Sequence, residues 1–97
     1  MKAIVLLKIT SGEVREAIHY LRRLKPVLGS CMTFGRYDAM AIVQGEGLEE
    51  IRQIILSEIQ PIPGVIETMP CLIVEETGLT HSDHIQEFLK ATQYSGS

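Results

Sequence analysis

The sequence predicts a single α+β domain in which strands and helices follow one another in the order βαββαβ. Three observations lead to this fold class. The first is that short apolar segments rich in β-branched residues alternate with segments whose apolar residues recur at helical spacing. The second is that glycine or proline separates these segments. The third is length: at 97 residues the chain has room for one domain with a small core, so oligomerisation is expected.

The first half of the chain is expected to hold a strand, a helix and a β-hairpin. Residues 3–10, "AIVLLKIT", are mostly apolar and β-branched, as in a buried strand. Residues 13–24 repeat apolar side chains every three or four positions, which is typical of an amphipathic helix. Residues 27–34 and 38–44 read as two further strands, joined by a turn through Gly35.

The second half is expected to add a helix and a last strand. Residues 48–60 carry an apolar stripe at helical spacing, and Glu49 and Glu50 stand near the positive end of the helix dipole. Residues 65–75 form a strand that Pro70 is expected to break. This order predicts two split βαβ units of the ferredoxin-like kind, with the strands arranged 4-1-3-2 in a four-stranded antiparallel sheet.

Both faces of the predicted sheet are apolar. Two helices cover only one face, so a monomer should be polar on the other. Alternation instead gives each of three strands apolar side chains on both sides: Ala3, Val5, Leu7 and Ile9 opposite Ile4 and Leu6 in the first, Ala39, Ala41 and Val43 opposite Met40 and Ile42 in the third, and Met69, Cys71 and Ile73 opposite Ile66, Leu72 and Val74 in the last. A patch of this size is expected to be covered by a second copy of the chain, as in a face-to-face homodimer of the dimeric α/β-barrel type.

The two cysteines are not expected to form a disulfide within the chain. Cys31 belongs to the second strand and Cys71 to the fourth, which lie at opposite edges in the predicted strand order. Three inter-strand spacings of about 4.8 Å separate these edges. Both are interpreted as small buried hydrophobic residues, and a cytoplasmic location is expected because no secretory segment is seen.

Charge and hydropathy argue against nucleic-acid and membrane partners. The net charge is -3, whereas domains that bind phosphate backbones usually carry a basic stripe. The basic cluster "RRLK" at 22–25 shares its helix with Glu13 and Glu16, and is interpreted as a solvated helix face. The longest apolar run, residues 3–7, is far shorter than the roughly 20 residues that cross a bilayer.

No catalytic residue, cofactor or metal site is predicted. His81, Asp83 and His84 are the only tight group of potential metal ligands, and they lack a fourth ligand. Asp38, in "FGRYD", is a better candidate for binding a small molecule, because its carboxylate follows a glycine that permits close backbone approach. Spacing alone equally allows a hairpin turn in which Asp38 bonds the amides of its own loop.

A family resemblance favours the interpretation of Asp38 as a ligand-binding residue. The stretch from Ala3 to about Glu75 resembles the effector-binding domain of the Lrp/AsnC regulators, also called the RAM domain. "TFGRYDAMAIV" is similar to the family's T-G-x-[YF]-D before an apolar strand, and "IQPIPGVIETMPCLIV" is similar to its final threonine-bearing strand. The resemblance implies a face-to-face dimer, assembly into an octamer or decamer ring, and amino-acid effectors bound between dimers near the hairpin loop.

Matching positions in the two motifs imply these ligand-binding residues: Gly35, Arg36, Tyr37, Asp38 and Thr68. Asp38 is expected to hold the ligand's amino group, and Tyr37 to wall the pocket. Pro70 stands where the family has a second threonine, which leaves the identity of the ligand open.

Two further expectations concern the ends of the chain. Family regulators carry an N-terminal helix-turn-helix, whereas Met1 here leads straight into the first strand, so the chain is not expected to bind DNA itself. Residues 1–76 are expected to form the RAM-like effector-binding and oligomerisation domain. Residues 77–97 form a tail with a short amphipathic helix, because Ile85, Phe88 and Leu89 recur at helical spacing.

The sequence therefore favours a non-enzymatic sensing and oligomerisation domain. It would bind a small amino acid or related metabolite at subunit interfaces and modulate transcription regulators or amino-acid metabolism, with an Lrp-like regulator as a candidate partner. One alternative is a small enzyme of the dimeric α/β-barrel class, monooxygenase-like or isomerase-like, which would use an enclosed cavity between helices and sheet. Another is a purely structural partner of a DNA-binding paralogue.

Overall fold

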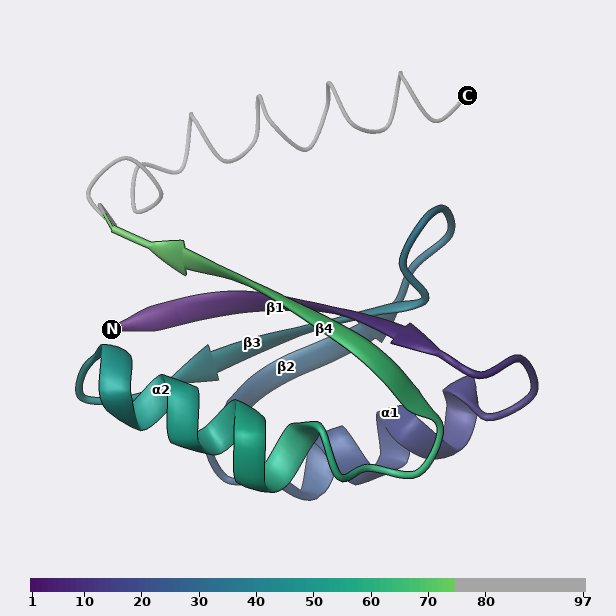
Figure 1. The fold of residues 1–97 in the computed structure, drawn as a ribbon, viewed down its shortest axis with the longest axis horizontal. Helices are drawn as coiled ribbons and strands as arrows, with labels where there is room; N and C mark the ends of the chain where they lie inside the picture. Colours follow the sequence, from purple (N-terminus) through teal and green to yellow (C-terminus); the bar gives the residue numbers. More distant parts are fainter. Residues whose placement is uncertain (75–97) are drawn as a thin grey trace.

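The computed structural model describes residues 1–74 and confirms the predicted ferredoxin-like fold, a four-stranded antiparallel sheet with two helices on one face (Figure 1). The elements are β1 (Lys2–Ile9), α1 (Val14–Arg23), β2 (Val27–Met32), β3 (Ala39–Gln44), α2 (Leu48–Ile54), a π-helical turn η1 (Ile55–Ile59) and β4 (Val65–Ile73). The predicted tail helix and the group His81, Asp83 and His84 lie outside the described residues. Within residues 1–74, no helix is long and apolar enough to cross a membrane.

The strand order is β2-β3-β1-β4, as predicted. β1 lies in the middle of the sheet and pairs antiparallel with β3 and with β4. Leu6 lies opposite Met40 on β3 and Met69 on β4, and Leu7 lies opposite Thr68. Because directly opposite residues share a face, these pairs assign every second residue of each strand to the helix side or to the other side.

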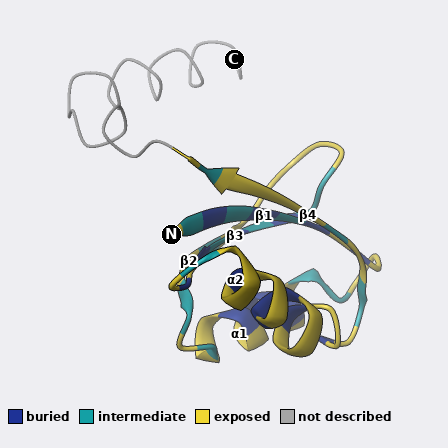
Figure 2. Ribbon diagram, turned by 60° about the vertical axis from the view of Figure 1, so that its left-hand side comes forward, coloured by how far each residue is buried: buried dark blue, intermediate teal, exposed yellow. Residues whose placement is uncertain are grey.

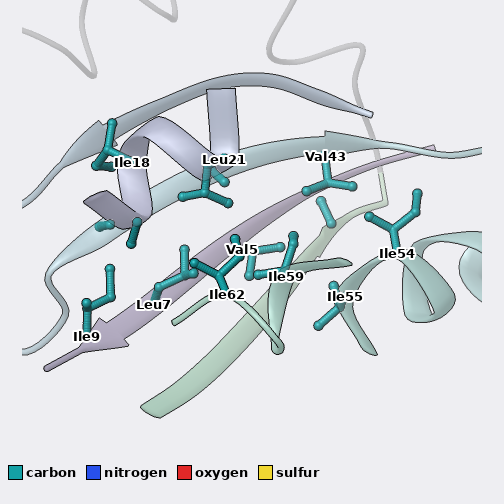
Figure 3. Packing of buried hydrophobic residues seen from close by; sticks show 14 of the residues in the cluster. Val5, Leu7, Ile9, Ile18, Leu21, Val43, Ile54, Ile55, Ile59 and Ile62 are labelled. Carbon is teal, nitrogen blue, oxygen red and sulfur yellow. The ribbon is translucent and has the colours of Figure 1, made fainter. Parts of the chain in front are cut away.

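The hydrophobic core lies between the sheet and the helices (Figure 2). Figure 3 shows Val5 and Leu7 of β1 close to Ile59 and Ile62, with Leu21 of α1 completing the layer. The buried residues are Ala3, Val5, Leu7, Ile9, Ala17, Ile18, Leu21, Ala39, Ala41, Val43, Ile51, Ile54, Ile55, Ile59 and Ile62. The core-facing alternation predicted for β1 and β3 is therefore confirmed.

The second helical segment is not a uniform α-helix. α2 ends at Ile54 and η1 continues from it, with the amide of Gln60 donating to the carbonyl of Ile55 at 2.8 Å, five residues back. Such a π-turn widens the helix locally and changes which side chains it presents to the sheet. Here Ile55 and Ile59 are both buried, so the turn keeps the apolar stripe on the core.

Two expectations about β4 and the cysteines are wrong. Pro70 does not break β4, and it lies opposite Val5 in a continuous strand. β4 is at the edge of the sheet and pairs only with β1, so a proline, which has no N–H, is tolerated there. Cys31 and Cys71 are both exposed on the single chain rather than buried. Their cross-strand partners are Met40 and Ile4, so both cysteines lie on the side of the sheet that the helices leave open.

Candidate functional site

The predicted effector motif forms the β2–β3 loop, residues 33–38, which rises from the sheet on the side away from the helices (Figure 1). Gly35 has φ +139°, a conformation that favours glycine. The loop is closed by the amide of Thr33, which donates to the carbonyl of Asp38 at 3.0 Å. The Thr33 hydroxyl donates to the carbonyl of Tyr37 at 2.7 Å, so the base of the loop is well braced.

Asp38 ties this loop to the end of β1. Its amide donates to the carbonyl of Leu7 at 2.8 Å, and its Oδ2 accepts a hydrogen bond from the amide of Ile9 at 2.8 Å. The carboxylate thus bonds a backbone amide of the neighbouring strand, not of its own loop. Among residues 1–74 no hydrogen bond engages Oδ1, so half of the carboxylate is available to another donor.

Tyr37 reaches from the loop across β1 to β4. Its hydroxyl lies 3.2 Å from Oε2 of Glu67, to which it donates, and 3.4 Å from Sδ of Met69. Desolvation and the neighbouring Glu67 carboxylate raise the pKa of Tyr37 above its usual value. The phenol therefore stays neutral across the physiological pH range and serves as a hydrogen-bond donor.

Arg36 and Lys8 give the loop a positive side. The guanidinium of Arg36 lies 5.9 Å from the centroid of the Tyr37 ring, within the range of a cation–π contact. Nζ of Lys8 donates to the carbonyl of Arg36 at 3.4 Å. The loop and its neighbours on β1 and β4 thus combine two carboxylates, Asp38 and Glu67, with one phenol and two cations within a short stretch of surface, which suits a zwitterionic ligand.

Thr68, the fifth predicted residue, lies on the opposite face of the sheet. It is placed opposite Leu7, whose side chain points into the core, and its Oγ1 accepts from Nε2 of Gln60 at 3.2 Å. Tyr37 instead contacts Glu67 and Met69, which belong to the other face. The structure brings Gly35, Arg36, Tyr37 and Asp38 together and leaves the Thr68 side chain apart from them.

Thr68 belongs to a groove between α2–η1 and β4 with a volume of about 380 Å³. This α2–β4 groove is lined by Leu48, Ile51, Arg52, Ile55, Leu56, Gln60, Thr68, Pro70 and Leu72. Only Arg52 among these is ionisable, and its guanidinium lies 3.3 Å from Oε1 of Glu49. Among the described residues, the lining of the groove is mostly apolar and includes no acid–base pair.

The face of the sheet opposite the helices, called the open face, carries apolar side chains on neighbouring strands. They are Ile4, Leu6, Met40, Ile42, Met69, Cys71 and Ile73. Met69 is 41% exposed and Cys71 is also exposed, while the strands around them hold the others half-buried. Within residues 1–74 this apolar surface is therefore only partly shielded from solvent.

Three residues of the site were not predicted from the sequence. Lys8 and Glu67 flank the β2–β3 loop only because β1 and β4 are neighbours, and they lie opposite each other in the register. The available signal was the alternation along β1 and β4, which marks Lys8 and Glu67 as polar ends of an otherwise apolar face. The third, Gln60, reaches Thr68 from the end of η1 and gave no sequence signal.

Comparison with known protein families places the chain in one of them. The family model described as the Lrp/AsnC ligand binding domain matches residues 2–82, most of the chain. The comparison with curated proteins found no match.

Solved structures agree in fold. The hypothetical protein PHS023 from Pyrococcus horikoshii is 24% identical with a TM-score of 0.71, over 82% of this chain and 96% of its own. AsnC of E. coli is 17% identical with a TM-score of 0.74, over 78% of this chain and 52% of its own.

The transcriptional regulator NMB0573 from Neisseria meningitidis, solved in complex with L-Met, is 17% identical with a TM-score of 0.70. The match covers 78% of this chain and 51% of that regulator. Identities this low establish a shared fold and leave the ligand of this chain undetermined. With a family model that spans residues 2–82 and a fold shared with regulators and with a small single-domain protein, the chain belongs to the Lrp/AsnC ligand-binding domain family.

Proposed function

We propose that this chain is a sensing and oligomerisation domain that binds a small amino acid or related metabolite beside the β2–β3 loop, at an interface between subunits. The observation that carries the proposal is that only one of the two carboxylate oxygens of Asp38 is hydrogen-bonded among residues 1–74. Its Oδ2 is held by the amide of Ile9 while Oδ1 has no partner among residues 1–74, so the charge is both fixed and available. A fixed carboxylate is a good receptor for a ligand ammonium group.

The remaining groups of the loop suit the rest of an amino acid. Arg36 supplies a cation for the ligand carboxylate, and Tyr37 supplies an aromatic wall whose hydroxyl is already anchored on Glu67. The loop is exposed on one side, so a single chain surrounds a ligand only in part. A second subunit would close the pocket, which supports a site at an interface. The regulator NMB0573, which shares the fold, was solved in complex with L-Met.

The open face supports a homodimer as the first level of assembly. Its apolar residues lie on β1, β3 and β4, and a face-to-face pair would remove them from water on both copies at once. No group in residues 1–74 forms a catalytic arrangement with the loop, so sensing rather than catalysis is the proposed activity. Modulation of a DNA-binding relative, through mixed assembly, is the proposed downstream effect.

Isothermal titration calorimetry with the twenty standard amino acids tests the ligand. At least one should bind the wild type, and Asp38→Asn should weaken that ligand by at least tenfold. The asparagine oxygen can still accept the Ile9 amide, so the melting temperature of this variant should stay near that of the wild type. Glu46→Gln, which removes a carboxylate beyond the far end of β3, is the matched control and should bind normally.

Two outcomes would overturn the sensing proposal. One is a panel of amino acids and related metabolites in which nothing binds, which would favour the structural alternative. The other is an Asp38→Asn variant that folds and binds the ligand as tightly as the wild type does. Co-purification with a helix-turn-helix relative that no ligand affects would also point to the structural role.

A further inference from the structure

The helix side of β4 is exposed, whereas the same side of β1 is buried. In the register, Leu72 of β4 lies opposite Ala3 and Pro70 lies opposite Val5. Ala3 and Val5 are fully buried, but Leu72 is 38% exposed and Pro70 is exposed as well. Figure 2 shows β4 exposed along most of its length beside β1. The helices thus cover the middle of the sheet and leave the helix side of this edge strand only partly covered within residues 1–74.

The α2–β4 groove lies where this cover is missing. Its volume of about 380 Å³ accommodates an aromatic side chain. Leu48 and Leu56, on its helical wall, are 55% and 43% exposed. Gln60 and Thr68 bond each other, so these polar groups are satisfied and the leucines are free for apolar contact. The groove is on the helix side of the sheet, so the homodimer proposed through the open face leaves it uncovered.

Residues 75–97, called the tail, follow directly from this edge strand and carry an apolar stripe of their own. The stripe predicted from the sequence consists of Ile85, Phe88 and Leu89, in an otherwise mostly polar segment. A helix with one apolar stripe gains most of its stability by packing that stripe against another apolar surface. These three residues lie beyond the family model, which ends at residue 82. The stripe is therefore an addition to the family domain, and it needs a surface to pack against.

The groove is within reach of the tail of the same chain. It runs along β4 from Leu72, two residues before the last described residue, back to Thr68, a length of roughly 14 Å at about 3.4 Å per residue. Residues 75–80 alone extend up to about 20 Å, and Gly78 allows the chain to reverse direction there. So short a connection holds the tail at an effective concentration on the order of millimolar, which favours the groove of its own chain over that of another copy.

We propose that Ile85, Phe88 and Leu89 pack into the α2–β4 groove of their own chain, as a third helix that lies beside α2 and covers β4. Phe88, the largest of the three, fills the space between the exposed leucines. The contact removes apolar surface from water on both partners, so it stabilises the domain and the helix together. It requires neither a ligand nor the homodimer, so its test is independent of the proposed function.

Tryptophan fluorescence of the full-length chain tests the contact, because the chain has no tryptophan of its own. Phe88→Trp places a single indole in the middle of the stripe, where its emission should lie at a shorter wavelength than in water and acrylamide should quench it less. Adding Leu56→Arg puts a charge into the groove and should shift the emission to that of an indole in water. Adding Leu28→Arg instead, at a leucine that is 54% exposed on β2 at the opposite edge of the sheet, is the matched control and should leave the emission unchanged.

A thiol cross-link distinguishes the groove of the same chain from that of a second copy, and it leaves the leucines of the groove intact. In a chain that carries Cys31→Ser and Cys71→Ser, Arg52→Cys places a thiol in the lining of the groove and Thr92→Cys places one at the next turn of the predicted stripe. A short bismaleimide should join these two thiols within one chain. Leu28→Cys combined with Thr92→Cys is the matched control and should give no internal link.

The results that would overturn the proposal are equally definite. It is wrong if the indole of Phe88→Trp emits as it does in water, or if Leu56→Arg leaves that emission unchanged. It is also wrong if Leu28→Arg changes the emission as much as Leu56→Arg does. A reagent that links the two thiols only between chains, or not at all, would likewise exclude the contact within one chain.

Discussion

A charge placed in the middle of the open face should separate the proposed dimer without unfolding the chain. Ile42 lies on β3 opposite Ile4 of β1, and its side chain is half-buried in the single chain. The substitution Ile42→Glu therefore removes little from the core of the monomer. In a face-to-face dimer, however, the same position would be closed off from water on both copies.

The cost follows from burial. Completing the burial of a half-buried isoleucine is worth about 1 kcal/mol, so the two copies together lose about 2 kcal/mol. Each glutamate left without a partner in the interface adds roughly 1 to 3 kcal/mol. The sum is about 4 to 8 kcal/mol, and at about 1.4 kcal/mol per tenfold the dimer dissociation constant rises by roughly three to six orders of magnitude.

Sedimentation equilibrium measures this change directly. The wild type should be dimeric or larger at micromolar concentration, and Ile42→Glu should be monomeric. Gln44→Glu is the matched control, because it places the same carboxylate on the same strand and face at an exposed position near the rim. A monomeric wild type, or an Ile42→Glu variant that dimerises as tightly as Gln44→Glu, would refute the assignment of the interface to the open face.

Two further predictions concern single residues of the described chain. Gly12 and Gly64 have φ of +90° and +91°, so alanine costs about 1 to 2 kcal/mol of strain at either position. A Cβ on Gly64 would also lie 2.9 Å from Cβ of Glu13, so chemical denaturation should show Gly64→Ala less stable than Gly12→Ala; equal stabilities would contradict this. The raised pKa of Tyr37 means that its contribution to stability is present below the unfolded pKa of 10.0 and is lost as pH rises through the folded value. Glu67→Gln should lower that pKa in an ultraviolet difference titration against Tyr37→Phe, and an unchanged midpoint would show that Glu67 has no part in the shift.

The fold was predictable because its signals are local and agree with one another. β1 is the plainest example, since alternation separates Val5 and Leu7 from Ile4 and Leu6, and the structure places the first pair in the core. The same alternation predicted a second apolar face, which the register confirms. The prediction for Pro70 was wrong because proline interrupts a strand only where a backbone N–H must bond a neighbouring strand. An edge strand has a neighbour on one side only, so a proline can be accommodated in it.

The site was predictable only in part, because its contacts join residues far apart in the sequence. The turn predicted through Gly35 is present, but nothing in the motif shows that Asp38 bonds the amide of Ile9. Thr68 was grouped with the loop because it belongs to the second family motif. Successive residues of a strand point to opposite faces, so Thr68 and Met69 lie on different faces, and Tyr37 contacts the face of Met69. The groove escaped prediction altogether, because it depends on how far β4 stands from α2.

Asp38 carries two roles that substitutions can separate. As an acceptor for the Ile9 amide it holds the start of β3 against the end of β1, and as a fixed charge it is the proposed receptor for a ligand. Asp38→Ala removes both roles and leaves a part-buried amide without its partner, which costs about 1 to 3 kcal/mol of stability. Asp38→Asn removes only the charge. A loss of binding in both variants with a loss of stability in one alone would attribute each role to its atom.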